Sequence, residues 1–153
     1  MKDRIIVSSL LFTIFLFLAC EKRATEAGIT NIYESSDRKS IYFDTTIKKG
    51  LVLVSDKDSV FSILDQTDDK KWVLLQSAPA EAGPGRVETQ NILYNVGHGI
   101  RIDDPLLGYE NCYFTGFSKQ GNEDYISFET MDSSGTSMSR SMKLKDLEEK
   151  IKK

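Results

Sequence analysis

Short apolar runs recur at about ten-residue spacing from Ile41 onward, and each ends at a turn-forming residue. Valine, isoleucine and aromatic residues dominate these runs, and helical spacing of apolar residues is scarce before the C-terminal tail. Runs of this length and composition predict strands. The expected strands are 41–43, 50–54, 60–64, 72–76, 87–92, 99–102, 113–117 and 125–130. We therefore expect an all-β fold built from small antiparallel barrels.

The run Trp72–Leu75 is apolar at every position. A strand with one solvent-facing side alternates apolar and polar residues, as the run Tyr125–Thr130 does. The strand that contains Trp72 should therefore be covered on both faces. We expect it to lie near the junction between two halves of one compact body.

Two parts of the chain share one plan. Phe61 and Trp72 in the first part align without a gap with Phe114 and Tyr125 in the second. Each part has a strand opened by glycine, a hairpin and a short closing segment, which is 87–92 in the first part and 142–147 in the second. The pattern predicts a structural repeat. A single antiparallel barrel or sandwich of about six to eight strands, without internal symmetry, is the alternative.

This order of elements resembles the SH3-like small barrel, including bacterial SH3 and Tudor-like modules. The segment 113–147 carries the resemblance best, and it ends in a Leu-Lys-Asp-Leu run where such barrels often close with a short strand or a helical turn. The resemblance implies a module that binds a peptide, a glycan or another ligand. Leu144, Leu147 and Ile151 also fall at helical spacing, so we expect a short C-terminal helix.

The N-terminal segment carries a signal of another kind. Lys2 and Arg4 precede the apolar stretch 5–18, which is short for a membrane-spanning helix but suits the central region of a secretory signal. The stretch ends in Leu18-Ala19-Cys20, which resembles the lipobox of type II signal peptides. The resemblance implies a signal peptide at 1–19 and a Cys20 whose thiol receives diacylglycerol, with acyl chains such as palmitate holding the protein to a membrane.

Other interpretations of this segment stay open. Phe17 departs from the leucine that a lipobox usually has at that position. An ordinary secretory signal cut near Ala19 and an uncleaved anchor helix are the alternatives. Glu21 follows the cysteine where some bacteria use aspartate to retain lipoproteins at the inner membrane, so the outer membrane or the cell surface is favoured.

The segment 21–40 is rich in charged and hydroxyl residues and has few large apolar ones. Such a segment cannot bury enough apolar surface to fold alone, so we expect a flexible tether. Its stretch Ile29–Tyr33 can instead pair as an edge strand. The expected organisation is a lipidated cysteine with its tether at 20–40, a first SH3-like half at 41–96, and a second half with the helical tail at 97–153.

Charge and reactive residues exclude several functions. The formal net charge is −3, so neither nucleic acid binding nor attraction to acidic lipid through a polybasic face is expected. Cys112 has no partner if Cys20 carries lipid, and a buried structural cysteine is favoured over a reactive thiol. The one histidine, His98, lies between two glycines and is expected to be structural or exposed. No metal or cofactor site is predicted.

Aromatic residues supply the candidate binding surface. Tyr113, Thr115 and Phe117 alternate along one predicted strand, and Tyr109 lies in the loop before it. In SH3-like barrels this region often forms an aromatic cleft, although core positions are the alternative, above all for Phe117. Arg86 ends a Gly-Pro-Gly loop that can contact a ligand.

These observations predict a lipid-anchored lipoprotein of the cell envelope that acts as a non-catalytic binding or interaction module. Its partners would be the membrane, reached through the N-terminal lipid, and an unidentified protein, peptide or glycan. An envelope enzyme of unidentified type and a purely structural lipoprotein are the alternatives.

Overall fold

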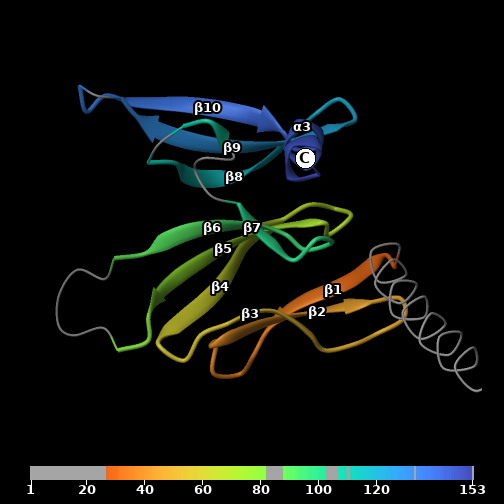
Figure 1. Cartoon of the computed structure of the whole chain (residues 1–153). Coiled ribbons are helices and arrows are strands. Elements are labelled where there is room, and N and C mark those ends of the chain that lie inside the picture. Colours follow the sequence, from red (N-terminus) through yellow and green to blue (C-terminus); the bar gives the residue numbers. More distant parts are fainter. Residues whose placement is uncertain (1–26, 82–87, 103–106, 110, 133, 153) are drawn as a thin grey trace, which may run out of the picture.

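The computed structural model describes residues 27–81, 88–102, 107–109, 111–132 and 134–152. Its strands form three antiparallel sheets stacked in layers, with one short helix at the C-terminal end (Figure 1). The all-β prediction is confirmed. The prediction of closed barrels is wrong, because each sheet in the described part of the chain is open. Stacking the sheets face to face buries their apolar sides without closing any of them.

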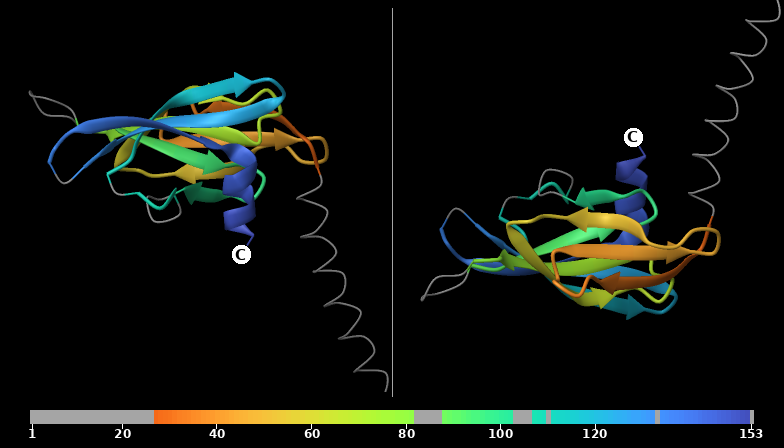
Figure 2. Two further views of the ribbon diagram at one scale, coloured as in Figure 1. Left: turned by 90° about the horizontal axis from the view of Figure 1, so that it is seen from above. Right: turned by 90° about the horizontal axis from the view of Figure 1, so that it is seen from below.

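The chain builds the layers in order. The first sheet holds β1 (Ile29–Glu34), β2 (Ser40–Thr45) and β3 (Leu51–Ser55). The middle sheet holds β4 (Ser59–Gln66), β5 (Trp72–Pro79), β6 (Gln90–Asn95) and β7 (Ile100–Ile102). The third sheet holds β8 (Tyr113–Gln120), β9 (Glu123–Met131) and β10 (Ser137–Lys143), and α3 (Leu144–Ile151) follows it. Views from above and below show an outer sheet covering each face of the middle one (Figure 2).

The middle strand β5 separates two hydrophobic cores. Trp72 and Leu74 point into the core shared with the third sheet and α3, whereas Val73 and Leu75 point into the core shared with the first sheet. All four side chains are at most 3% exposed. The predicted two-sided burial of this strand is therefore confirmed, and each such side chain contributes roughly 1.5–3 kcal/mol of hydrophobic stabilisation.

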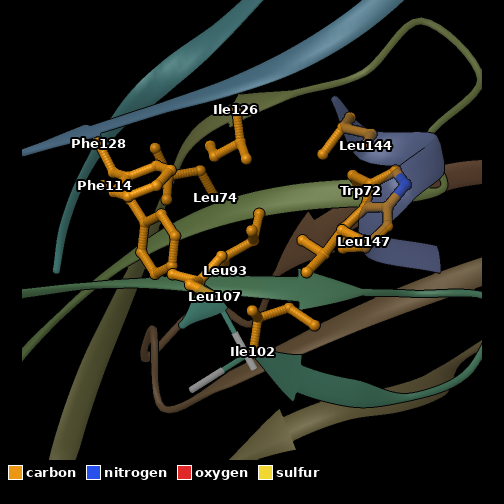
Figure 3. Packing of buried hydrophobic residues seen from close by; sticks show 10 residues of the cluster. All are labelled: Trp72, Leu74, Leu93, Ile102, Leu107, Phe114, Ile126, Phe128, Leu144 and Leu147. Atoms are coloured by element: carbon orange, nitrogen blue, oxygen red, sulfur yellow. The ribbon is translucent and has the colours of Figure 1, made fainter. Parts of the chain in front are cut away.

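The core between the middle and third sheets is also closed by the helix. Leu144 and Leu147 from α3 pack beside Trp72, while Phe114 and Phe128 fill the other end (Figure 3). The predicted C-terminal helix is confirmed, because its buried residues fall at the expected helical spacing. The helix thus closes the end of this core that contains Trp72.

The first sheet begins inside the segment expected to be the tether. β1 is an edge strand at Ile29–Glu34 that pairs with β2, and Ile32 is only 6% exposed. Of the two expectations for this stretch, the edge strand is the one observed. The tether therefore ends before Ile29 and not at residue 40. Composition alone missed the boundary because pairing with β2 satisfies the backbone of a strand that has few apolar side chains.

Two further expectations about the second half are corrected. Residues 137–141 were not expected to form a strand, and 142–143 were expected to begin the closing segment, but Ser137–Lys143 forms β10, which pairs with β9 along its length. The closing segments of the two halves also differ. Gln90–Asn95 is an inner strand of the middle sheet, whereas 142–147 spans the end of β10 and the start of α3.

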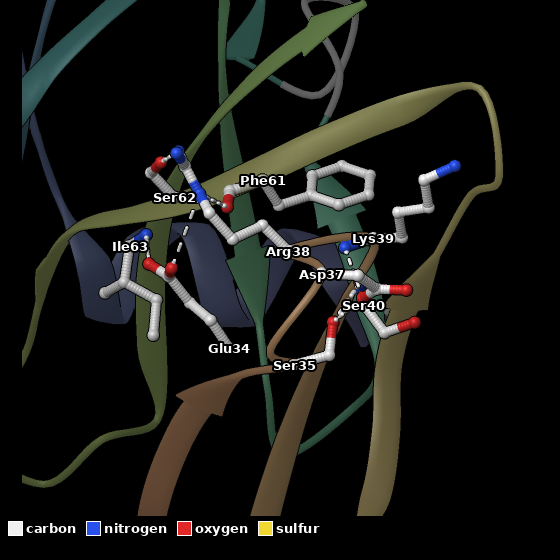
Figure 4. Close-up of polar contacts among 9 residues, drawn as sticks. All are labelled: Glu34, Ser35, Asp37, Arg38, Lys39, Ser40, Phe61, Ser62 and Ile63. Atoms are coloured by element: carbon white, nitrogen blue, oxygen red, sulfur yellow. Dashed lines mark hydrogen bonds and ion pairs between the residues drawn. The ribbon is translucent and has the colours of Figure 1, made fainter. Parts of the chain in front are cut away.

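The free edge of β4 is capped by the β1–β2 turn (Figure 4). The backbone amide of Phe61 donates to the carbonyl of Arg38 at 2.7 Å, and the amide of Ile63 donates to Oε1 of Glu34 at 2.8 Å. The Arg38 guanidinium donates in turn to the Phe61 carbonyl and to the Ser62 hydroxyl. These contacts satisfy backbone groups that an open sheet edge would expose to another chain.

Candidate functional site

The predicted aromatic surface does not form as one site. A β-bulge between Phe114 and Gly116 changes the alternation of β8. As a result Phe117 shares the inner face with Phe114 and packs against the core, whereas Tyr113 is 47% exposed on the outer face. The expectation that Tyr113, Thr115 and Phe117 share one face is therefore wrong, and the core alternative for Phe117 is the one observed.

Tyr109 lies on the other side of the third sheet from Tyr113. Its ring centroid is 5.7 Å from that of the core residue Phe128, and the Arg140 guanidinium carbon lies 4.6 Å from the Tyr109 centroid. Contacts of this kind are typical of an aromatic side chain that closes the rim of a core. Tyr109 and Tyr113 therefore cannot bind one ligand between them.

Two of the predicted functional residues lie outside the described part of the chain, namely Cys20 and Arg86. Cys112 is half-buried and packs against the core below the third sheet. Its position agrees with a structural role for this thiol.

The structure forms a groove where the chain enters the first sheet, and we call it the N-terminal groove. Ala27, Ile29, Gly97 and His98 line two adjoining cavities of about 440 and 260 Å³. The larger cavity has a mixed polar and apolar lining and is completed by Gly28, Asp69, Lys71, Asn95, Glu148 and Lys152. The smaller one has an apolar floor and is completed by Phe43, Thr45, Leu51, Val52, Leu53, Val96 and Gly99.

The turn between β6 and β7 shapes the middle of the groove. The side chain of Asn95 is buried, and its Oδ1 accepts a hydrogen bond from the amide of His98 at 3.0 Å. Gly99 follows with φ of +63°, a conformation that residues with a side chain rarely adopt. The turn with its two glycines around His98 thus places an exposed histidine at the wall of the groove, as one of the two expectations for His98 had it.

The charges of the groove are mixed. Lys71 forms an ion pair with Asp69 at 3.5 Å, while Glu148 in α3 and Lys152 at its C-cap contribute one further charge of each sign. Among the described residues, no group of three or more His, Cys, Asp and Glu side chains could hold a metal ion. The groove therefore offers an apolar floor, a histidine and a rim of both charges, which suits an amphipathic occupant.

Sequence reasoning missed this groove because its walls come from several separate parts of the chain. Ile29 belongs to the assumed tether, Phe43 to the first half and Glu148 to the tail. Only His98 was noticed, since its flanking glycines are visible locally. A second feature that sequence reasoning missed is the stack of Tyr33 on Tyr42, at 5.7 Å between ring centroids on paired positions of β1 and β2.

Comparison with known proteins supplies no relative from which a role could be transferred. No family model, no curated protein and no solved structure matches the chain. Within the described residues, no helix has the length and apolar character needed to cross a membrane.

Proposed function

We propose that the protein is a lipid-anchored lipoprotein of the bacterial cell envelope, held at the outer membrane or the cell surface, whose folded body is a non-catalytic binding module. The observation that carries the proposal is the basic start, the apolar stretch and the Leu18-Ala19-Cys20 ending of the N-terminal segment. The early start of β1 supports it. Only residues 21–28 separate Cys20 from the first strand, and a chain of that length spans at most about 30 Å when fully extended. A lipid on Cys20 would therefore keep the body close to the membrane.

The N-terminal groove is the proposed binding site of the module. Its apolar floor and its rim of both charges fit a peptide segment that combines apolar and charged side chains. A glycan would instead favour an exposed aromatic platform. The exposed Tyr113 stands apart from Tyr109 on the opposite face, so the third sheet presents no paired platform for a sugar ring.

Lipid attachment is tested by replacing each cysteine in turn. The full-length protein and the Cys112→Ser variant should incorporate labelled palmitate and partition into the detergent phase, because both keep the thiol at Cys20. The Cys20→Ser variant should lose the label and move to the aqueous phase. If Cys20→Ser keeps the label and the partition, the lipoprotein assignment is wrong.

The binding role is tested by filling the groove. His98 is exposed on a turn, so His98→Trp should leave thermal unfolding unchanged while its indole obstructs the groove. Proteins captured by the detergent-solubilised wild-type lipoprotein should be lost with His98→Trp and retained with Tyr113→Ala. Equal capture by His98→Trp would remove the groove as the binding site.

A further inference from the structure

We infer that the loop between β2 and β3 docks on an anionic phospholipid bilayer, with Ile47 entering the interfacial region and Lys48 and Lys49 meeting the headgroups. The inference rests on the lipid anchoring proposed above and adds which end of the body faces the membrane. Ile47 is 74% exposed, more than any other large apolar side chain of the described residues. Lys48 and Lys49 follow it directly, and both are exposed.

The loop is held rigidly in a form that presents Ile47 to solvent. The Thr45 hydroxyl oxygen accepts hydrogen bonds from the amides of Ile47, at 3.3 Å, and Lys48, at 2.9 Å. The Thr45 amide donates to the Lys48 carbonyl at 2.7 Å, and the Gly50 amide donates to the Asp44 carboxylate at 2.8 Å. The apolar side chain of Ile47 on this ordered tip exposes most of its surface to water, and insertion into a bilayer interface would remove that cost.

The loop also lies at the point where the chain enters the body. The Thr46 amide donates to the carbonyl of Gly28 at 3.0 Å, which joins the loop to the residue just before β1. Figure 1 shows that the end of β2, where the loop begins, lies on the same side of the molecule as the start of β1. A lipid on Cys20 would therefore bring this end, rather than the opposite end at the β9–β10 turn, to the bilayer.

Local charge at this end differs from the net charge of −3 for the whole chain. Besides the two loop lysines, Lys71 and Lys152 line the adjoining groove. The acidic residues that line the groove or bond to the loop are Asp44, Asp69 and Glu148. Of these, Asp44 accepts the Gly50 amide and Asp69 pairs with Lys71. The loop lysines thus remain available for anionic headgroups.

A tethered loop needs only a weak affinity for the membrane. The lipid anchor makes docking an intramolecular event, so a single apolar side chain and two lysines can shift the body into contact with the surface. The N-terminal groove opens at the same end, so a docked body would offer it to a partner segment that lies along the bilayer.

The experiment measures how deeply this loop enters a bilayer. Full-length lipidated protein is reconstituted into vesicles of phosphatidylcholine and phosphatidylglycerol with brominated acyl chains, which quench nearby tryptophan. Ile47→Trp places a reporter in the loop. Met131→Trp is the matched control, because Met131 is 58% exposed at the end of β9, and the β9–β10 turn lies at the opposite end of the molecule (Figure 1). The native Trp72 is 3% exposed and gives the same background in both.

We expect bromine to remove roughly half or more of the added emission of Ile47→Trp and to leave that of Met131→Trp unchanged. Adding Lys48→Gln and Lys49→Gln to Ile47→Trp should lower the docking equilibrium roughly tenfold or more. Flotation with the vesicles is measured in parallel. Variants that float without selective quenching of Ile47→Trp would overturn the docking loop while anchoring stands. Failure of the wild-type protein to float would overturn the anchoring itself and the docking with it.

Discussion

The carboxylate of Asp65 accepts a hydrogen bond from the backbone amide of Phe117, with 2.9 Å between Oδ2 and N. Both partners lie at β-bulges, one between Ile63 and Asp65 in β4 and the other between Phe114 and Gly116 in β8. A bulge leaves a backbone amide without a ladder partner, and Asp65 supplies the missing acceptor. Together with the bond from Asn91 Nδ2 to the Phe114 carbonyl, at 2.7 Å, this contact fixes the third sheet on the middle one.

Replacing Asp65 with leucine should therefore destabilise the whole body. The Phe117 amide would lose its acceptor in a part-buried place, which costs about 1–3 kcal/mol. Urea unfolding measures the loss. Asp65→Asn is the control, because an amide oxygen can still accept the bond and most of the stability should remain. Equal stability of the leucine variant and the wild type would mean that the contact does not contribute.

Leu74→Asp should unfold the body in a single transition. The side chain of Leu74 is 1% exposed in the core between the middle and third sheets. A carboxylate placed there would be buried among apolar side chains with no group to pair with its charge. Leu74→Ala should cost about 2–5 kcal/mol and remain folded. The control is Leu64→Asp, because Leu64 is 45% exposed at the β4 bulge and should tolerate the change. Thermal unfolding decides the matter, and an unchanged melting temperature in Leu74→Asp would contradict the two-sided burial of β5.

Glu34→Ala should open the edge of β4. Oε1 of Glu34 accepts the hydrogen bond of the Ile63 amide. Without the Glu34 carboxylate, that amide has no protein acceptor at the edge of the sheet. We expect a loss of about 1 kcal/mol and faster hydrogen exchange at Ile63. Glu34→Gln keeps an acceptor oxygen and should retain most of the protection. Unchanged exchange at Ile63 in the alanine variant would show that the cap is dispensable.

The contact of Lys119 with Asp68 should make stability depend on acid pH. The bond, at 2.5 Å, lowers the pKa of Asp68 below its usual 3.8. A carboxylate with a lowered pKa in the folded state stabilises it above the unfolded pKa, and the contribution disappears as the pH falls through the folded pKa. The stability gap between wild type and Asp68→Asn should therefore narrow as the pH falls below about 4.

Urea unfolding at neutral and acid pH measures this gap, which we expect to be small because both side chains are exposed. The same bond raises the pKa of Lys119, so its contribution is present below the usual 10.5 and is lost as the pH rises through the folded pKa. Lys119→Met should abolish the acid dependence as Asp68→Asn does. A gap that widens in acid would reverse the sign and refute the assignment.

Much of the secondary structure could be predicted because its signals are local. The apolar runs at Trp72–Leu75 and at Leu144 with Leu147 carry their own periodicity, and the structure confirms both the doubly covered strand and the helix. β10 could not be predicted in this way. Its sequence is mostly serine and methionine, and it becomes a strand only because β9 offers a partner along its length.

The candidate site was less accessible to sequence reasoning. One extra residue in β8 places Phe117 on the inner face, and the only local sign of this bulge is Gly116, an isolated glycine inside the expected strand. The N-terminal groove joins Ile29, His98 and Glu148, which are distant in the chain and meet only after the sheets have stacked.

The sequence by itself determined the all-β class, the positions of most strands, the helical tail and the expectation of a lipid on Cys20. Each of these depends on the order of neighbouring residues, through periodicity, turn chemistry or a short motif. The tertiary structure decided that the sheets stay open and stack, that β1 belongs to the body, and that the loop carrying Ile47 is bonded through Thr46 to Gly28. These features depend on contacts between distant segments, whose free energy appears only when apolar faces meet and bulged strands find their partners.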